Sequence, residues 1–155
     1  MLKFSTKLLN VANDAIRASL AAGAIYVYSG TQPVNANAAP TGTLLGIATV
    51  NAGAWTAAVS TANGLDFAAS SAGILSKSPS ETWQFVGLTD GTAGWFRYVS
   101  GVAADSLSDD TATYPRIDGR ISTSGAEMRL SSLTIVQGAT TTIDICSISW
   151  PASLQ

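Results

Sequence analysis

The stretch Glu81–Ser100, ETWQFVGLTDGTAGWFRYVS, constrains the fold more than any other part of the chain. Two short runs rich in aromatic and β-branched residues, Thr82–Thr89 and Gly94–Ser100, are separated by a turn that contains Asp90 and Gly91. Such runs, bounded by turn formers, are typical of paired antiparallel strands, and we predict a hairpin. Both faces of each run carry large apolar groups, which favours a central position between two layers. Glycines at positions 87, 91 and 94 mark a bulge and a tight turn.

One segment near the N-terminus has the periodicity of a helix. Residues Ser5–Ala22 place apolar side chains at helical spacing, and most polar side chains fall opposite them. Ser5 or Thr6 is placed to cap the start of this helix, and Gly23 is placed to end it. The apolar positions are Leu8, Leu9, Val11, Ala12, Ala15, Ile16 and Leu20. We expect the helix either to cover an open end of the β body or to dock on a partner.

The rest of the chain alternates short apolar runs with turn residues. The runs recur at a spacing of roughly ten residues with no helical segment between them, a pattern typical of antiparallel β folds. The predicted fold is all-β, a two-sheet antiparallel sandwich of jelly-roll type with one N-terminal helix, and an up-and-down barrel is the alternative. Residues 1–22 are expected to form an arm and the helix, and residues 23–155 the sandwich domain. The further expected strands are 24–28, 43–50, 55–60, 65–69, 116–121, 127–130, 133–136 and 140–150, with Asn63 and Gly64 as a hairpin turn between 55–60 and 65–69.

Charged residues are scarce, at 12% of 155 residues. This is about half the usual share, and a surface so poor in charge favours association with other protein. The eight Lys and Arg residues are scattered and the net charge is −2, which argues against binding to nucleic acid. The chain contains no apolar run of the roughly 18 residues that a membrane-spanning helix requires, so no membrane partner is expected.

The residue types that carry most enzyme chemistry are missing or dispersed. Histidine is absent, which removes the commonest general base and metal ligand. The ten acidic residues show no spacing that singles out a catalytic pair, so the sequence predicts no enzyme, no cofactor and no metal. Asp105, Asp109 and Asp110 share one loop, but they lack the order and the glycine of an EF-hand calcium loop. Cys146 is the sole cysteine and lies in an apolar run, which indicates a buried thiol and fits synthesis in a reducing cytoplasm.

Five phrases, taken in order, resemble a set of small virion proteins of tailed phages. They are IYVYSGTQPVNANAAPTGTLLG (25–46), NGLDFAASSAGILSKSPSETW (63–83), GTAGWFRYV (91–99), PRIDGRISTSGAEMRLSSLTI (115–135) and TTTIDICSISWP (140–151). The resemblance covers nearly the whole chain from about Phe4. These are matches of sequence order and contain no catalytic motif, so they bear on family and fold more than on a particular activity.

The resemblance implies a capsid decoration, or cement, protein: a jelly-roll β domain that binds outside an HK97-type shell and bridges neighbouring capsomers. The implied partners are the major capsid protein and further copies of the chain, as a dimer or a trimer, on the virion surface. The candidate partner-binding residues are Met1, Leu2, Lys3 and Phe4, because a terminal arm is often ordered only by what it touches.

Other functions remain open. A tail or fibre-associated virion protein has the same β-rich build. A carbohydrate-binding module is a second alternative, in which Trp55, Trp95 and tyrosines form a stacking platform for a host-surface glycan. A hydrolase requires two carboxylates that converge in one pocket.

Overall fold

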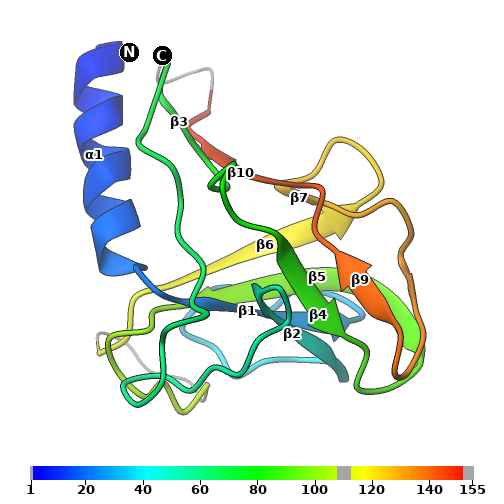
Figure 1. Ribbon diagram of the computed structural model, residues 1–155. Coiled ribbons are helices and arrows are strands. Elements are labelled where there is room, and N and C mark those ends of the chain that lie inside the picture. The colour runs from blue at the N-terminus through cyan, green and yellow to red at the C-terminus, as the bar shows by residue number, and fades with distance from the viewer. Residues whose placement is uncertain (1, 108–112, 152–155) are drawn as a thin grey trace.

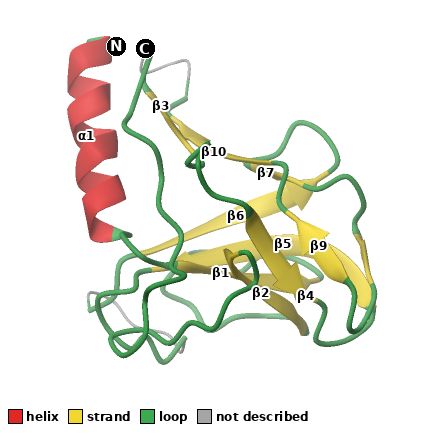
Figure 2. Cartoon of the chain, in the orientation of Figure 1, coloured by secondary structure: helices red, strands yellow, loops and turns green. Residues whose placement is uncertain are grey.

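The computed structural model describes residues 2–107 and 113–151 of the protein. Within these ranges one helix stands beside a curled β-sheet of ten strands (Figures 1 and 2). The helix α1 spans Thr6–Ser19, and the strands are β1 (Ala24–Ser29), β2 (Leu44–Val50), β3 (Ile74–Ser76), β4 (Trp83–Val86), β5 (Gly91–Val99), β6 (Arg116–Ser122), β7 (Met128–Arg129), β8 (Thr134–Ile135), β9 (Thr140–Thr142) and β10 (Ile145–Ser149). The expected β-rich architecture with an N-terminal helix is therefore confirmed.

The sheet is mixed, which corrects the expectation of a purely antiparallel arrangement. Its strand order is β3-β10-β7-β6-β5-β1-β2-β4-β9, and β8 also pairs with β5. β6 and β7 run parallel, with Ile121 beside Met128. The chain bends back between them at Gly125, whose φ of 67° suits glycine. Both Ile121 and Met128 are buried, so the parallel pairing brings two apolar side chains into the core side by side.

The predicted hairpin between 82–89 and 94–100 is wrong. β4 pairs with β2 and β9, whereas β5 pairs with β1, β6 and β8. The segment after β4 is held by distant backbone partners: Gly87 N–H donates to the Ala139 carbonyl and Leu88 N–H to the Leu45 carbonyl. These long-range hydrogen bonds direct the chain away from the local turn that the residue types favour.

β5 nevertheless has the central position that its residues predict. Phe96 and Tyr98 pack into the main core, whereas Trp95 and Arg97 lie on the opposite face and are also fully buried. The expected bulge is at Gly94: Tyr28 pairs with Trp95 and Ser29 with Ala93, so Gly94 is skipped. A Cβ atom at Gly94 would lie 2.1 Å from the Gly30 carbonyl oxygen, so only glycine fits there.

Three further boundaries differ from expectation. Residues 55–60 and 65–69 form isolated bridges rather than strands, and Gly64 packs against the backbone of Ala22 instead of turning a hairpin. The expected strand 140–150 is divided into β9 and β10 at Ile143, whose N–H donates to the Trp83 carbonyl. The helix ends before Gly23, with Leu20 as the C-cap residue, and Ala22 takes the positive φ of 50°.

Candidate functional site: a helix with two apolar faces

The inner face of α1 is fixed to the β body. Ser5 caps the helix as expected, because its side-chain oxygen accepts a hydrogen bond of 3.3 Å from Leu8 N–H. Leu9 and Leu20 are buried, and Ile16 packs against the main core. The helix contacts β3 most closely among the strands. The helix therefore packs on the β body, in line with the first of the two roles expected from the sequence.

A buried amide fixes the orientation of the helix. Asn13 is fully buried, and its Nδ2 donates to the Gly73 carbonyl at 2.9 Å and to Ser70 Oγ at 3.2 Å. Its Oδ1 accepts a hydrogen bond of 3.0 Å from Trp150 Nε1, near the C-terminal end. Both ends of the amide are satisfied, as a buried polar group requires. We call this set of contacts the Asn13 latch.

Two neighbouring polar residues of α1 extend the latch. Asn10 Oδ1 accepts a hydrogen bond of 2.8 Å from Gly73 N–H, and Asp14 Oδ1 accepts one of 3.0 Å from Ser70 N–H. The sequence pattern places these residues opposite the apolar face and so assigns them to solvent. Asn13 and Asp14 follow Asn10 by three and four residues, which puts all three on one side of the helix and is the signal that indicates a shared polar contact.

The opposite face of α1 is apolar and exposed. Leu8 and Val11 keep 51% and 54% of their surface accessible, and Ala15 and Ala18 are exposed beside them. These four residues recur at helical spacing, so they form one line along the helix, which we call the outer stripe. Figure 1 shows α1 at one edge of the molecule. The outer stripe is exposed, whereas Leu9 and Leu20 on the other side of the helix are buried, so the stripe faces away from the β body.

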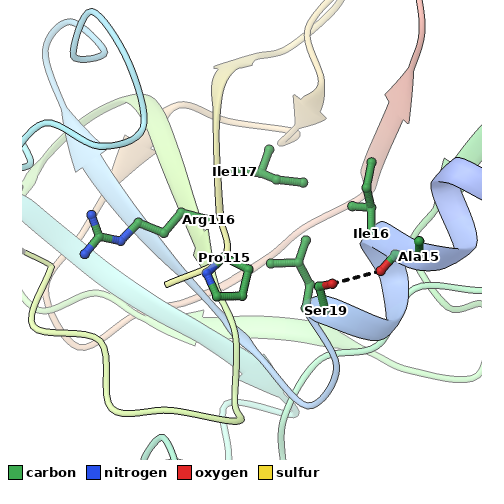
Figure 3. A pocket seen from close by; sticks show the side chains of 7 residues that line it. Ala15, Ile16, Ser19, Pro115, Arg116 and Ile117 are labelled. Carbon is green, nitrogen blue, oxygen red and sulfur yellow. Dashed lines mark hydrogen bonds between the residues drawn. The ribbon is translucent and has the colours of Figure 1, made fainter. Parts of the chain in front are cut away.

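A shallow groove of about 410 Å³ begins beside the outer stripe. Its lining residues are Ala15, Ile16, Ser19 and Leu20 of α1, and Pro115, Arg116 and Ile117 at the start of β6. Figure 3 shows the Arg116 guanidinium turned away from the helix, so mainly apolar groups remain near α1. Ser19 Oγ donates to the Ala15 carbonyl at 3.0 Å, which satisfies the hydroxyl within the helix.

The predicted partner-binding arm precedes the helix. Leu2 is 66% exposed, Lys3 is exposed, and Phe4 is half-buried. Met1 lies outside the described residues. The arm therefore presents one large apolar side chain, Leu2, to solvent at the end of α1 that also begins the outer stripe.

A second cluster of functional groups is buried between β5, β6 and two loops. Arg97 makes a bidentate ion pair with Asp118, with Nε–Oδ1 and Nη2–Oδ2 distances of 2.8 and 2.7 Å, and Arg116 pairs with Asp105. Arg97 also donates to the Ala38 carbonyl at 2.8 Å. The alternation of residues 116–121 points Asp118 outward, yet its side chain is only 2% exposed. The Arg97 guanidinium that pairs with it also donates to the Leu107 carbonyl in the segment after β5. Asp105, one of the three aspartates considered as calcium ligands, is paired with Arg116 and so has a structural role. The other two, Asp109 and Asp110, lie outside the described residues.

Most acidic side chains of the described ranges accept hydrogen bonds from backbone or basic groups. Those with carboxylate oxygens that accept hydrogen bonds include Asp14, Asp66, Glu81, Asp90, Asp105, Asp118 and Glu127. No group of three metal-ligating side chains is found in residues 2–107 and 113–151. These contacts are structural, since they fix turns, loops and the helix.

The proposed glycan platform is not formed as expected. Trp95 is fully buried and stacks on Tyr28 with a centroid distance of 4.6 Å. Trp55 is half-buried, and its Nε1 donates to the Ala22 carbonyl at 2.8 Å. Because Trp95 offers no face to a sugar, the pair of tryptophans does not make a stacking surface.

The chain was compared with protein families, with curated proteins and with solved structures, and none of them matches it. No helix among the described residues is both long and apolar enough to cross a membrane. A role for the surface formed by the arm, the outer stripe and the groove therefore has to be inferred from the geometry of that surface.

Proposed function

We propose that the protein is a capsid decoration, or cement, protein of a tailed phage, which binds the outside of an HK97-type shell and stabilises contacts between capsomers. The observation that carries the proposal is a set of exposed apolar side chains, Leu2, Leu8 and Val11, at one edge of a rigid body. The Asn13 latch fixes the orientation of α1, which carries Leu8 and Val11. Exposed apolar groups at such a position mark a surface for contact with other protein.

The physical role of such a protein is adhesion. A chain that binds the assembled shell and not its separated subunits stabilises the shell by mass action. A modest contact suffices, because many symmetric copies act together. The scarcity of charge, at 12% of residues, supports a protein whose surface meets other protein more than solvent.

Within this proposal the arm contacts the major capsid protein. Leu2 supplies an apolar anchor, and Phe4 lies where the arm joins the helix cap at Ser5. The jelly-roll arrangement implied by the sequence resemblance belongs to the same proposal, as does the virion surface as location. The alternative is a tail or fibre-associated virion protein with the same adhesive character.

The test of the arm is a shell-binding assay. Shells assembled from the capsid protein of the same genome are mixed with the chain, and the bound fraction is measured by co-sedimentation. A variant that lacks Leu2, Lys3 and Phe4 keeps the Ser5 cap, so the helix is preserved, and we expect its occupancy to fall at least tenfold. The matched control is Leu88→Ser, which removes an exposed leucine after β4 and should leave occupancy unchanged.

The test of the function is the position of the chain in the virion. A cryo-EM reconstruction should place its density on the outer surface of the shell. Density confined to the tail would replace the decoration function with the tail alternative. Equal shell occupancy of the truncated variant and the intact chain would eliminate the role of the arm while leaving the decoration function to the reconstruction.

A further inference from the structure

We infer that two copies of the chain pair through the outer stripes of their α1 helices, in antiparallel orientation, about a twofold axis beside Val11. The inference concerns the free protein, and it is independent of whether the chain binds a phage shell. The arm precedes the stripe and remains available for another partner.

The sizes of the stripe residues indicate the orientation. The N-terminal half of the stripe carries Leu8, and the C-terminal half carries Ala15 and Ala18. Leu8 lies three residues before Val11 and Ala15 four residues after it, so at a rise of about 1.5 Å per residue Leu8 of one copy lies over Ala15 of the other. A parallel pair would instead place leucine on leucine and alanine on alanine, which leaves a gap at one end.

The groove adds to this fit. It begins at Ala15 and Ser19 and has a volume of about 410 Å³. In the antiparallel pair, Leu8 of the second copy lies at the mouth of this groove, near Ile16 and Ile117. A large apolar side chain thus meets a hollow beside a small residue, which is the complementarity that well-packed interfaces have.

Charges flank the stripe in a pattern that favours the same orientation. Lys7 and Asp14 are seven residues apart, so they lie on the same flank of the helix, about two turns from each other. The antiparallel pair brings Lys7 of each copy opposite Asp14 of the other. In a parallel pair this flank lies on opposite sides of the contact in the two copies, so Lys7 and Asp14 would not face each other. The Asp14 side chain is 44% exposed, so it has surface available for this contact in addition to its bond with Ser70 N–H and its ion pair with Arg17 of the same helix at 3.5 Å.

The geometry of the molecule permits the pairing. α1 lies at one edge of the molecule with the β body on its inner side (Figure 1), so two helices that meet by their outer stripes keep the two bodies apart. A contact made by one face of a 14-residue helix belongs to the interfaces below roughly 1,200 Å², which are typical of weak complexes. We therefore expect a dimer that dissociates on dilution.

Cysteine cross-linking tests the pairing directly. The native Cys146 is buried, and burial raises the pKa of its thiol to about 12, so it does not compete with an introduced thiol. Val11→Cys should give a disulfide-linked dimer under mild oxidation, at least tenfold faster than Val34→Cys, a control whose side chain is 96% exposed on a loop. Cross-linking of Val11→Cys at the rate of the Val34→Cys control would overturn the inference.

The same assay tests the orientation. In the antiparallel pair the two copies of residue 18 are separated by about 21 Å along the helices, so Ala18→Cys alone should not cross-link. A mixture of Leu8→Cys and Ala15→Cys should form a cross-linked heterodimer. Ala18→Cys dimers that form as fast as Val11→Cys dimers would show a parallel pair and overturn the antiparallel register.

The charge pattern is tested in the chain without cysteines added. Lys7→Glu places a carboxylate opposite Asp14, and we expect it to raise the dimer dissociation constant roughly tenfold at low salt, measured by analytical ultracentrifugation. The difference should shrink in about 1 M salt, where exposed charges are screened. A dissociation constant unchanged by Lys7→Glu at low salt would contradict the facing of Lys7 and Asp14.

Discussion

Asn13 is the single residue on which the position of the helix depends most. Its amide joins three separate parts of the chain, because it bonds to Gly73 and Ser70 before β3 and to Trp150 after β10. The bond to Gly73 is buried and the other two are partly buried, and at such sites the loss of a partner costs more than the bond itself stabilises. Asn13 thus determines the orientation of α1 and, with it, the direction in which the outer stripe faces.

We expect Asn13→Leu to lower the free energy of unfolding by about 2–4 kcal/mol, because the Gly73 carbonyl and Trp150 Nε1 lose a buried partner. Urea unfolding followed by tryptophan fluorescence measures the change. Asn37→Ala, at an exposed loop position, is the control and should stay within about 0.5 kcal/mol of the parent. If both variants were equally stable, the latch would have no energetic role.

At the scale of elements, β5 and β6 together hold the loops that cover their outer face. Arg97 extends from β5 to Asp118 on β6 and to the Ala38 carbonyl of the loop before β2. Arg116 joins Asp105 to the start of β6. Both ion pairs are buried, and their bonds to Ala38 and Asp105 keep the loops packed over this face of the two strands.

Asp118→Asn should lower the free energy of unfolding by about 3–5 kcal/mol, because it leaves the Arg97 guanidinium buried without a counter-charge. The matched control is Glu127→Gln, since the pair between Arg120 and Glu127 is largely exposed and should contribute no more than about 1 kcal/mol. Chemical unfolding of both variants compares them. If both variants lost a similar amount of unfolding free energy, the buried Arg97–Asp118 pair would contribute no more to stability than the exposed Arg120–Glu127 pair.

For the whole molecule, the absence of histidine leaves no side chain with an ordinary pKa near neutrality. On the alkaline side, burial raises the pKa of Cys146 from 9.0 to about 12 and raises the pKa of Tyr98 well above 10.0. Both groups keep their protons in the folded state at a pH where the unfolded chain releases them. The stability that they contribute is present in full below about pH 9 and is lost as the pH rises toward 12.

We therefore expect the free energy of unfolding to be level between about pH 6 and 8 and to fall above about pH 9. Each buried group contributes a slope of about 1.4 kcal/mol per pH unit, first Cys146 and then Tyr98. Urea unfolding across this range measures the profile. Cys146→Ala should delay the onset to about pH 10, where tyrosine ionises in the unfolded chain. A profile that stays level to pH 11 would contradict the assignment.

Several features of the protein follow from its sequence alone. The helix with its Ser5 cap, the glycine bulge in β5 and the buried Cys146 depend on properties that act within a few residues: capping groups, allowed φ angles and apolar runs. The burial of β5 on both faces follows from the same kind of pattern. These signals are local, so no knowledge of distant neighbours is needed to interpret them.

The tertiary structure alone decided which strands meet and what the polar residues do. β4 pairs with β2 and β9 because backbone groups far along the chain compete successfully with the local turn at Asp90 and Gly91. Asn13 and the Asp118 side chain are polar on any sequence scale, and only their distant partners make them stable when buried. Paired strands and buried hydrogen bonds join residues that are far apart in the sequence and meet only on folding. Spacing along the sequence therefore does not determine which residues pair.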